Sequence, residues 1–487
     1  MSFPRWSSIE HLQSAIAEGK ITVKEATKQY LESIERQKDL NAVTAVNPKA
    51  LEEAEALDSL RSDRRGPLHG LPIIIKDQIE TAGIPTAYGS IACKDQIPPK
   101  DATLVTKLRQ AGAVILGKST MPDWAAAWFS TSSLSQTTRN PFDGSRDPGG
   151  SSSGSGTAVA ADMALAAIGG DTGGSIRLPS SFCGLVGVRV TPGRISRDGM
   201  SSLVLTQDTP GPMTKTVSDA AKLLDVLVGY DENDDFTSIN ALTSPKNFQN
   251  AIKQPSLLLN GKRLGVLRQV FGSHKGINHV LNTTLQKLQK DAACELIDVS
   301  IPNLPDLLAQ TSVYILRSKS DINTFLQSRQ QLSHLKIEDL HASKTYHQTL
   351  DLINALVKGP SLYTQSPHFG TAMEAISRFQ RVVASLFAKY NLDAMIYPTC
   401  QVLAPKTQDL LESRWSSFDF PTNTVIGSQL LWTAVSVPVG GCKDDEWPDD
   451  PELPVGLEIL GTPLSEEKIL GLAAGVEELV SGVRKGG

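Results

Sequence analysis

The chain has 487 residues, of which 40% are hydrophobic and 20% charged, and its formal net charge is −5 at pH 7. This composition is typical of a globular protein with a large core, and the weakly acidic balance without a basic run argues against nucleic acid as a partner. No stretch approaches the ~20 apolar residues of a membrane-spanning helix, and the first residues lack an apolar signal core, so we expect no membrane span and a cytoplasmic location.

The cysteines support the same compartment. They are odd in number and contain no close pair, a pattern typical of free thiols in a reducing environment. They are Cys93, Cys183, Cys294, Cys400 and Cys442.

Residues 1–62 predict helices. Ser8 precedes an apolar stripe over residues 9–16, and Thr22 with Glu25 forms a capping box ahead of a second amphipathic stretch. A third helix is expected at residues 50–61.

Strands and helices alternate in residues 63–230, which we expect to form the catalytic core. The expected strands are 73–75, 114–116 and 185–190, and the expected helices are 103–111 and 157–162. Such alternation predicts an α/β fold with a central mixed, mainly parallel β-sheet flanked by helices on both faces. Functional side chains are then expected in the loops at strand ends.

The rest of the chain is expected to complete this sheet. Residues 231–390 form a variable region on the substrate side, with helices at 277–290 and 372–390. Strands at 392–397, 434–439 and 455–460 and a last helix from about residue 465 occupy residues 391–487. An acidic, proline-rich loop is expected at 442–454. Length alone is compatible with two or three domains.

Two glycine-serine clusters mark the segment GGSSSGSGTAVAADMALAAIGGDTGGSIRLP at residues 149–179, and Ser151 and Ser175 lie 24 positions apart in it. Glycines allow tight turns and close approach of backbone N–H groups to a substrate. Successive N–H groups in such turns form an anion-binding concavity, which a tetrahedral oxyanion requires. The segment therefore indicates a nucleophile beside an oxyanion hole.

Lys76 follows an apolar run, Leu71-Pro72-Ile73-Ile74-Ile75, which predicts a fully buried strand. Desolvation lowers the pKa of a buried amine by up to about 3–5 units. A neutral lysine can take the proton of a serine hydroxyl, which is otherwise a poor nucleophile. Together with the two serines, Lys76 forms a possible relay that needs no histidine.

These features have other interpretations. A lysine after a strand is commonly a surface group, and a glycine-serine turn before a helix can hold phosphate. The turn lacks the G-K-[ST] ending of a P-loop, and no GxGxxG fingerprint occurs. The histidines show no HExxH spacing and no GxSxG elbow is present, which disfavours a metal hydrolase and a Ser-His-Asp enzyme. We expect neither cofactor nor metal.

With its GGSS…DTGGSIR segment and upstream Lys-Asp pair, the chain resembles the amidase signature family. Further blocks agree in order: TAGIP (81–85), DATLVTKLRQAGAVILGK (101–118), RNPFDGSRDPGG (139–150), FCGLVGVRVTPGRIS (182–196), TQDTPGPMTKTVSDAAKLLDVL (206–227) and LPVGLEILGTP (453–463). The resemblance spans most of residues 1–230 and 390–480 and only loosely the middle. It implies one large domain over residues 1–487.

The resemblance also assigns roles. Ser175 would be the acyl-accepting nucleophile, Ser151 the bridging serine in a cis peptide, and Lys76 the base. The N–H groups of Thr172, Gly173, Gly174 and Ser175 would form the oxyanion hole.

Residues next to these are expected to support the site, and two positions differ from the usual family pattern. Asp171 is expected to hold the turn as a hydrogen-bond acceptor, and Arg177 to pair with Asp171 or a nearby carboxylate, with substrate binding as the alternative. Ser153 replaces a usual glycine, and Gly170 a frequent threonine whose hydroxyl assists the bridging serine. That hydrogen bond would then be missing, or supplied by Ser152 or Ser153.

The implied function is hydrolysis of a carboxylic or peptide amide through an acyl-enzyme on Ser175. SRDGM (196–200) and TQDTPGPM (206–213) resemble the branch that includes peptide amidases. An acyltransferase or amide-forming enzyme using the same acyl-serine, and a catalytically dead binding protein, stay open. No segment indicates a component of a transamidosome. We expect a small-molecule amide as partner and a monomer or homodimer.

The acyl pocket is expected in the variable middle. Its aromatic residues either line an apolar cleft or pack in the core: Tyr314, Phe325, Tyr363 and Phe369.

Overall fold

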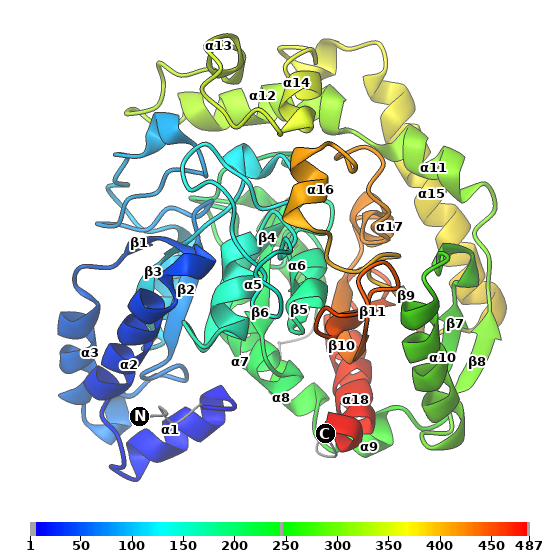
Figure 1. Cartoon of the computed structure of the whole chain (residues 1–487), viewed down its shortest axis with the longest axis horizontal. Coiled ribbons are helices and arrows are strands. Elements are labelled where there is room, and N and C mark those ends of the chain that lie inside the picture. Colours follow the sequence, from blue (N-terminus) through cyan, green and yellow to red (C-terminus); the bar gives the residue numbers. More distant parts are fainter. Residues whose placement is uncertain (1–5, 244–246, 485–487) are drawn as a thin grey trace.

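One sheet of eleven strands runs through the computed structural model, which describes residues 6–243 and 247–484 (Figure 1). The strand order is β1-β3-β2-β4-β6-β5-β10-β11-β9-β7-β8. The strands are β1 (Val43–Val46), β2 (Pro72–Lys76), β3 (Val114–Ser119), β4 (Ala166–Asp171), β5 (Val186–Arg189), β6 (Thr209–Thr214), β7 (Arg263–Val266), β8 (Glu295–Asp298), β9 (Ala394–Pro398), β10 (Ala434–Cys442) and β11 (Leu453–Leu460).

The strands pair in both senses. Parallel pairs join β3, β2 and β4 towards one edge and β9, β7 and β8 at the other. Antiparallel pairs join the strands between them and attach β1 to β3. The mixed α/β sheet is confirmed, but its parallel share is smaller than the alternation predicted. One reason is that β5 and β6, and β10 and β11, follow each other without a crossover helix and pair antiparallel.

Helices flank the sheet as expected (Figure 1). They are α1 (Ile9–Ala17), α2 (Val23–Arg36), α3 (Ala50–Asp58), α4 (Thr103–Gln110), α5 (Ser153–Ala160), α6 (Arg177–Phe182), α7 (Val217–Leu227), α8 (Phe248–Ala251), α9 (Pro255–Leu258), α10 (Lys275–Lys290), α11 (Leu304–Thr311), α12 (Tyr314–Gln327), α13 (Ile337–Ala342), α14 (Asp351–Leu356), α15 (Phe369–Tyr390), α16 (Thr407–Leu411), α17 (Val425–Gln429) and α18 (Glu466–Arg484). Near the sheet centre, α5 packs on β4 and α6 on β5, β10 and β11, while α7 and α18 contact each other and pack on β6 and β10.

Local sequence signals explain the elements nearest the site. The predicted capping box is confirmed at α2, where Glu25 N donates to Thr22 Oγ1 (3.0 Å) and Thr22 N donates to the Glu25 carboxylate (2.9 Å). All five residues of β2 are buried, as the apolar run predicted, because β2 lies between β3 and β4 and the helices α2 and α5 pack on it. The strand thus delivers Lys76 to the interior.

A helical layer formed by α11–α15 extends along the top and right side in Figure 1. Its apolar side chains, among them Leu326 and Ile353, form a second core cluster with residues such as Trp124 and Tyr88. Strands from all four segments that we predicted join the single sheet, since residues 231–390 contribute β7 and β8. The subdivision at residues 62, 230 and 390 stays a prediction.

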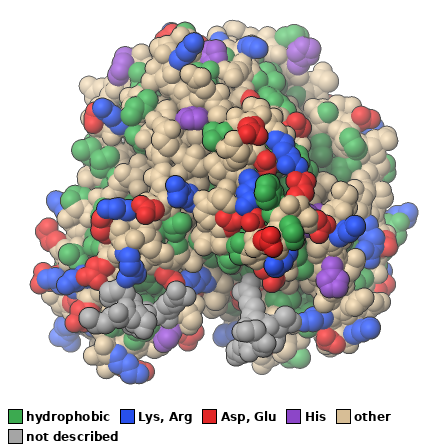
Figure 2. Space-filling model, in the orientation of Figure 1, with side chains coloured by type: hydrophobic (Ala, Val, Ile, Leu, Met, Phe, Trp, Pro, Cys, Tyr) green, Lys and Arg blue, Asp and Glu red, His purple; other side chains and the backbone are tan. Residues whose placement is uncertain are grey.

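The surface in Figure 2 shows basic and acidic side chains interspersed over this face. Among residues 6–243 and 247–484, no helix combines the length and the apolar character that crossing a bilayer requires.

Candidate active site

Lys76 and Ser151 meet inside the protein. Lys76, the last residue of β2, is fully buried, and its Nζ donates to Ser151 Oγ (2.7 Å) and to Gly170 O (3.2 Å). Ser151 is also fully buried and follows a cis peptide bond after Gly150, as the family resemblance implied. The alternative of a surface lysine is therefore wrong.

Burial changes the acidity of Lys76. Desolvation lowers the pKa of its ammonium group to about 7, although the nearby carboxylates of Asp171 and Asp208 partly oppose the shift. Near neutral pH a large fraction of the amine is therefore unprotonated and able to accept a proton.

Ser175 lies where the second glycine turn meets a cavity. Its backbone carbonyl accepts from Ser152 N (3.1 Å), which joins the two glycine-serine turns. Ser175 is 4% exposed and lines a cavity of about 470 Å³, the space into which a substrate could enter. In the described part of the chain no hydrogen bond joins the hydroxyls of Ser151 and Ser175, so proton transfer between them stays a prediction.

The turn before Ser175 requires glycine. A Cβ on Gly173 would overlap the Tyr314 hydroxyl and the Trp128 ring, and a Cβ on Gly174, whose φ is +138°, would overlap Thr424. Thr424 Oγ1 donates to Gly173 O (2.8 Å) and holds the turn. Within residues 6–243 and 247–484, no protein acceptor takes the N–H groups of residues 173–175, which leaves them available to a developing oxyanion.

Asp171 and Arg177 hold this turn from behind. Burial raises the pKa of Asp171, but Arg177 and Arg189 oppose this more strongly, so its pKa lies well below its ordinary value. Arg177 Nε donates to Asp171 Oδ2 (3.1 Å) and Arg189 Nη1 to Asp171 Oδ1 (2.7 Å). Arg177 also pairs with Glu458, and all four side chains are fully buried. The predicted pairing of Arg177 with Asp171 is confirmed.

Asp208, which holds Thr172 beside the turn, was not anticipated from sequence. The Thr172 hydroxyl donates to Asp208, whose carboxylate also accepts from the N–H groups of Leu203 (2.9 Å) and Val204 (3.1 Å). Asp208 was visible only as part of the block TQDTPGPM. Its role depends on a contact with residue 172, which sequence spacing does not reveal.

The two serines that could replace the missing threonine hydroxyl, Ser152 and Ser153, differ in their hydrogen bonds. Ser152 Oγ donates to Gly170 O (3.2 Å) and accepts from Gly170 N (3.2 Å), so it holds the carbonyl that receives Lys76. Ser153 Oγ is buried and has no hydrogen-bond partner in the described part of the chain. Of the two candidates to replace the threonine hydroxyl, Ser152 is the one in contact with residue 170.

Packing disfavours a side chain at position 170. A Cβ there would overlap Gln78 Oε1 and lie within 2.7 Å of the Met200 methyl group. Gln78 is held in place because its Nε2 donates to Ser201 O (2.7 Å). The volume of the usual threonine side chain is thus occupied by Gln78 and Met200.

We expect Gly170→Thr to lower the free energy of unfolding by about 1–3 kcal/mol, the usual cost of overpacking a core. Urea unfolding of the variant measures this. Gly370→Thr is the matched control, because nothing lies within 4 Å of a Cβ at that exposed helical position. An equal effect of the two substitutions would contradict the overlap with Gln78.

The cavity beside Ser175 is formed by the helical layer and by loops from both halves of the chain. Its lining residues are mostly apolar: Ala125, Ala127, Trp128, Leu203, Leu308, Ala309, Ser312, Tyr314, Ile315, Leu352, Ser417, Phe418, Asp419, Phe420, Thr422, Val425 and Gln429, together with Ser175.

Of the four aromatic candidates, Tyr314 lines this cavity and the other three do not. Phe325 packs edge-on against Tyr88 in the second core cluster, at 5.3 Å between ring centroids. Tyr363 and Phe369 contact each other at 5.2 Å. For these three residues the expectation that they line the cleft is wrong. Helical periodicity does not show which neighbouring side chain an aromatic ring contacts.

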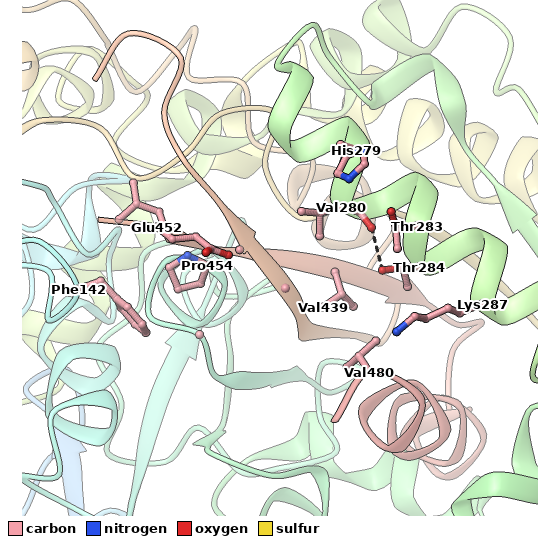
Figure 3. Close-up of a pocket in the computed structure, with 14 residues that line it drawn as sticks. Phe142, His279, Val280, Thr283, Thr284, Lys287, Val439, Glu452, Pro454 and Val480 are labelled. Carbon is pink, nitrogen blue, oxygen red and sulfur yellow. Dashed lines mark hydrogen bonds between the residues drawn. The ribbon is translucent and has the colours of Figure 1, made fainter. Parts of the chain in front are cut away.

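A larger cavity of about 630 Å³ lies elsewhere, between α10 and the ends of β10 and β11 (Figure 3). Lys287 and His279 project from α10, and Thr284 Oγ1 donates to Val280 O (3.0 Å) within the same helix. Because this cavity contains none of the predicted site residues, we place the candidate active site in the smaller one.

A sequence model of the family described as Amidase matches residues 25–470. The chain belongs to the amidase family. Among the described residues, no group of three or more His, Cys, Asp or Glu side chains is placed to hold a metal ion.

Relatives with similar sequences match nearly the whole length of the chain. A glutamyl-tRNA(Gln) amidotransferase subunit of Thermoanaerobacter pseudethanolicus is 32% identical over 97% of this chain and 96% of its own length. The protein of the same name from Methanosarcina acetivorans is 33% identical over 96% of each chain. Components of an amidotransferase, which no sequence segment indicated, are therefore among the relatives.

Solved structures add a second kind of relative. The native peptide amidase of Stenotrophomonas maltophilia has a TM-score of 0.85 with 30% identity and covers 97% of both chains. The glutamyl-tRNA(Gln) amidotransferase subunit of Thermotoga maritima has a TM-score of 0.72 with 27% identity, covering 98% of this chain and 96% of its own. The protein is accordingly an enzyme of a family that acts on C–N bonds.

Proposed function

We propose that this amidase family enzyme hydrolyses a carboxylic or peptide amide through an acyl-enzyme on Ser175. The observation that carries the proposal is the buried amine of Lys76, 2.7 Å from Ser151 Oγ and with its pKa lowered to about 7 by desolvation. A base of that pKa, close to a serine in a water-poor interior, is suited to activate a hydroxyl.

In the proposed mechanism, neutral Lys76 takes a proton from Ser151 while Ser151 takes the proton of Ser175. Ser175 Oγ forms a bond to the amide carbon, and the N–H groups of residues 172–175 stabilise the oxyanion. The C–N bond then breaks as the leaving nitrogen receives the proton back through Ser151. Water repeats the sequence on the acyl-serine and releases the acid.

Acyl or amide transfer is the second candidate, and the amidotransferase relatives favour it. The same acyl-serine would form, and the released nitrogen or the acyl group would pass to an acceptor other than bulk water. We infer a cytoplasmic monomer or homodimer for the hydrolase, whereas a transferase would imply membership of a larger complex.

The deciding experiment is a screen of primary amides, anilides and peptide C-terminal amides. A hydrolase releases amine and acid with substrate alone, and added hydroxylamine diverts part of the acyl group to a hydroxamate. If turnover requires an amine acceptor or a partner protein, transfer is the function.

Ser151→Ala should lower kcat/KM for the best amide by about 10²-fold, within the usual contribution of general acid–base catalysis. The loss should be smaller than for Lys76 or Ser175, because a water in the vacated space can carry the proton. Steady-state kinetics at fixed pH measures the loss. Unchanged kcat/KM would contradict a bridging role for this hydroxyl.

A further inference from the structure

The side chains that line the cavity beside Ser175 indicate the class of substrate. This inference rests on the proposed function. We propose that this enzyme acts on amides whose acyl group is apolar, and that it discriminates against amides whose acyl group ends in a carboxylate.

Apolar side chains dominate the walls. They come from segments far apart in sequence and include Trp128, Phe420, Leu203, Leu308, Ile315 and Leu352. Trp128 also contacts the turn of Gly173, so one wall of the cavity continues into the nucleophile loop. An acyl chain bound to Ser175 would therefore exchange water for apolar contacts.

No positive side chain is present to receive a carboxylate. Among the described residues that line the cavity, none is Lys, Arg or His. The buried arginines behind the nucleophile turn, Arg177 and Arg189, are bound to Asp171. An anionic substrate group would lose its water without gaining a cationic partner, which is unfavourable.

The carboxylate that lines the cavity adds repulsion. Asp419 Oδ1 accepts from Ser416 N (2.8 Å) and Ser416 Oγ (2.7 Å), and these hydrogen bonds lower the pKa of Asp419, so it is anionic at neutral pH. The side chain is exposed at the cavity rim. Its effect on a charged substrate is therefore modest and reduced by salt.

The loop that carries Asp419 is tied to both sides of the cavity. Trp128 Nε1 donates to Ser417 O (2.9 Å), and Ser417 N donates to Asp351 Oδ2 (2.8 Å). Asp351 begins α14, and Trp128 contacts the turn before Ser175, so the acidic rim is held against the cavity in a defined place. The position of the Asp419 charge beside the cavity is therefore fixed by these hydrogen bonds.

Three primary amides of equal chain length test the proposal: hexanamide, 6-aminohexanamide and adipamate, which end in methyl, ammonium and carboxylate. We expect kcat/KM to be highest for hexanamide and about 10-fold lower for adipamate, because its carboxylate loses water along the apolar walls without gaining a cationic partner and ends near the negative charge of Asp419. The ammonium compound should lie between them, since it can reach Asp419 at the rim.

A matched pair of variants gives a second measurement. Ala309 is exposed and lines the cavity, so Ala309→Arg adds a cation without overpacking and Ala309→Gln adds a neutral side chain of similar length. Arginine should raise the adipamate-to-hexanamide ratio of kcat/KM by about threefold to fivefold relative to glutamine, as one solvent-exposed ion pair allows.

Two results would overturn the proposed substrate class without contradicting the acyl-enzyme. The first is a kcat/KM for adipamate within threefold of that for hexanamide. The second is no turnover of any of the three amides by protein whose Ser175 still reacts with a fluorophosphonate probe. Failure of both labelling and turnover would instead contradict the proposed function on which the inference rests.

Discussion

Ser175→Ala should lower kcat/KM for every amide substrate by about 10³-fold or more, as expected when the nucleophile of a relay is removed. The alanine lacks the oxygen that accepts the acyl group, while the turn that holds it keeps its glycines and its contact with Thr424. The variant should therefore unfold at a temperature close to that of the wild type. Steady-state kinetics and thermal unfolding measure the two quantities.

Labelling gives an independent readout. A fluorophosphonate probe should modify the wild type at residue 175, located by peptide mass spectrometry, and should leave Ser175→Ala unmodified. Ser153→Ala is a matched control, because it removes a buried hydroxyl that has no partner in the described part of the chain. It should retain both labelling and turnover. Activity of Ser175→Ala close to the wild-type value would refute an acyl-enzyme on this residue.

Lys76→Met should also lower kcat/KM by about 10³-fold or more, since methionine keeps the apolar stem but cannot accept a proton. In the wild type, kcat/KM should rise with pH through an apparent pKa near 7 and then level off, because the neutral amine is the active form and desolvation lowers its pKa to about 7. The residual activity of Lys76→Met should lack this rise. A wild-type profile that is flat between pH 5.5 and 9 would contradict a lysine base.

The same shift predicts how stability depends on pH. The pKa of Lys76 is about 7 in the folded protein against an ordinary value of 10.5. Between these values the unfolded chain binds a proton that the folded protein does not, so unfolding becomes less favourable as pH rises. The wild type should gain about 1.4 kcal/mol per pH unit relative to Lys76→Met in this window, measured by urea unfolding. A decrease across the window would refute a neutral buried amine.

Parts of this fold could be predicted from short-range patterns. The buried strand before Lys76 was recognised because a strand covered on both sides needs apolar residues at every position. The capping box of α2 was recognised because its donors and acceptors lie three residues apart. Where the pattern and its partner are close in sequence, local chemistry is sufficient.

Other elements were missed because tertiary pairing overrides local preference. The strand β4 ends in Gly169-Gly170-Asp171, and its neighbour β6 reads TPGPMT, so both lack the β-branched pattern that predicts strands. They form strands because they pair with each other in the sheet interior. Helix α5 begins at Ser153, four residues before the expected start; its first turn lies against the end of β3, where Ser155 Oγ is 2.7 Å from Ser119 Oγ and a Cβ on Gly154 would overlap Thr120.

The amino-acid order alone indicated the chemical groups of the candidate site: a lysine ending an apolar strand and two serines in glycine turns. The folded chain was needed to show that Lys76 meets Ser151, that Gln78 fills the space above Gly170, and that none of the described residues lining the cavity at Ser175 is cationic. Burial matters for function, because it shifts the pKa of Lys76 and, as we propose, determines which substrate charge the cavity accepts. A local pattern can predict that a strand is buried, but the side chains that surround it come from segments far away along the chain, so no local pattern shows which side chains meet.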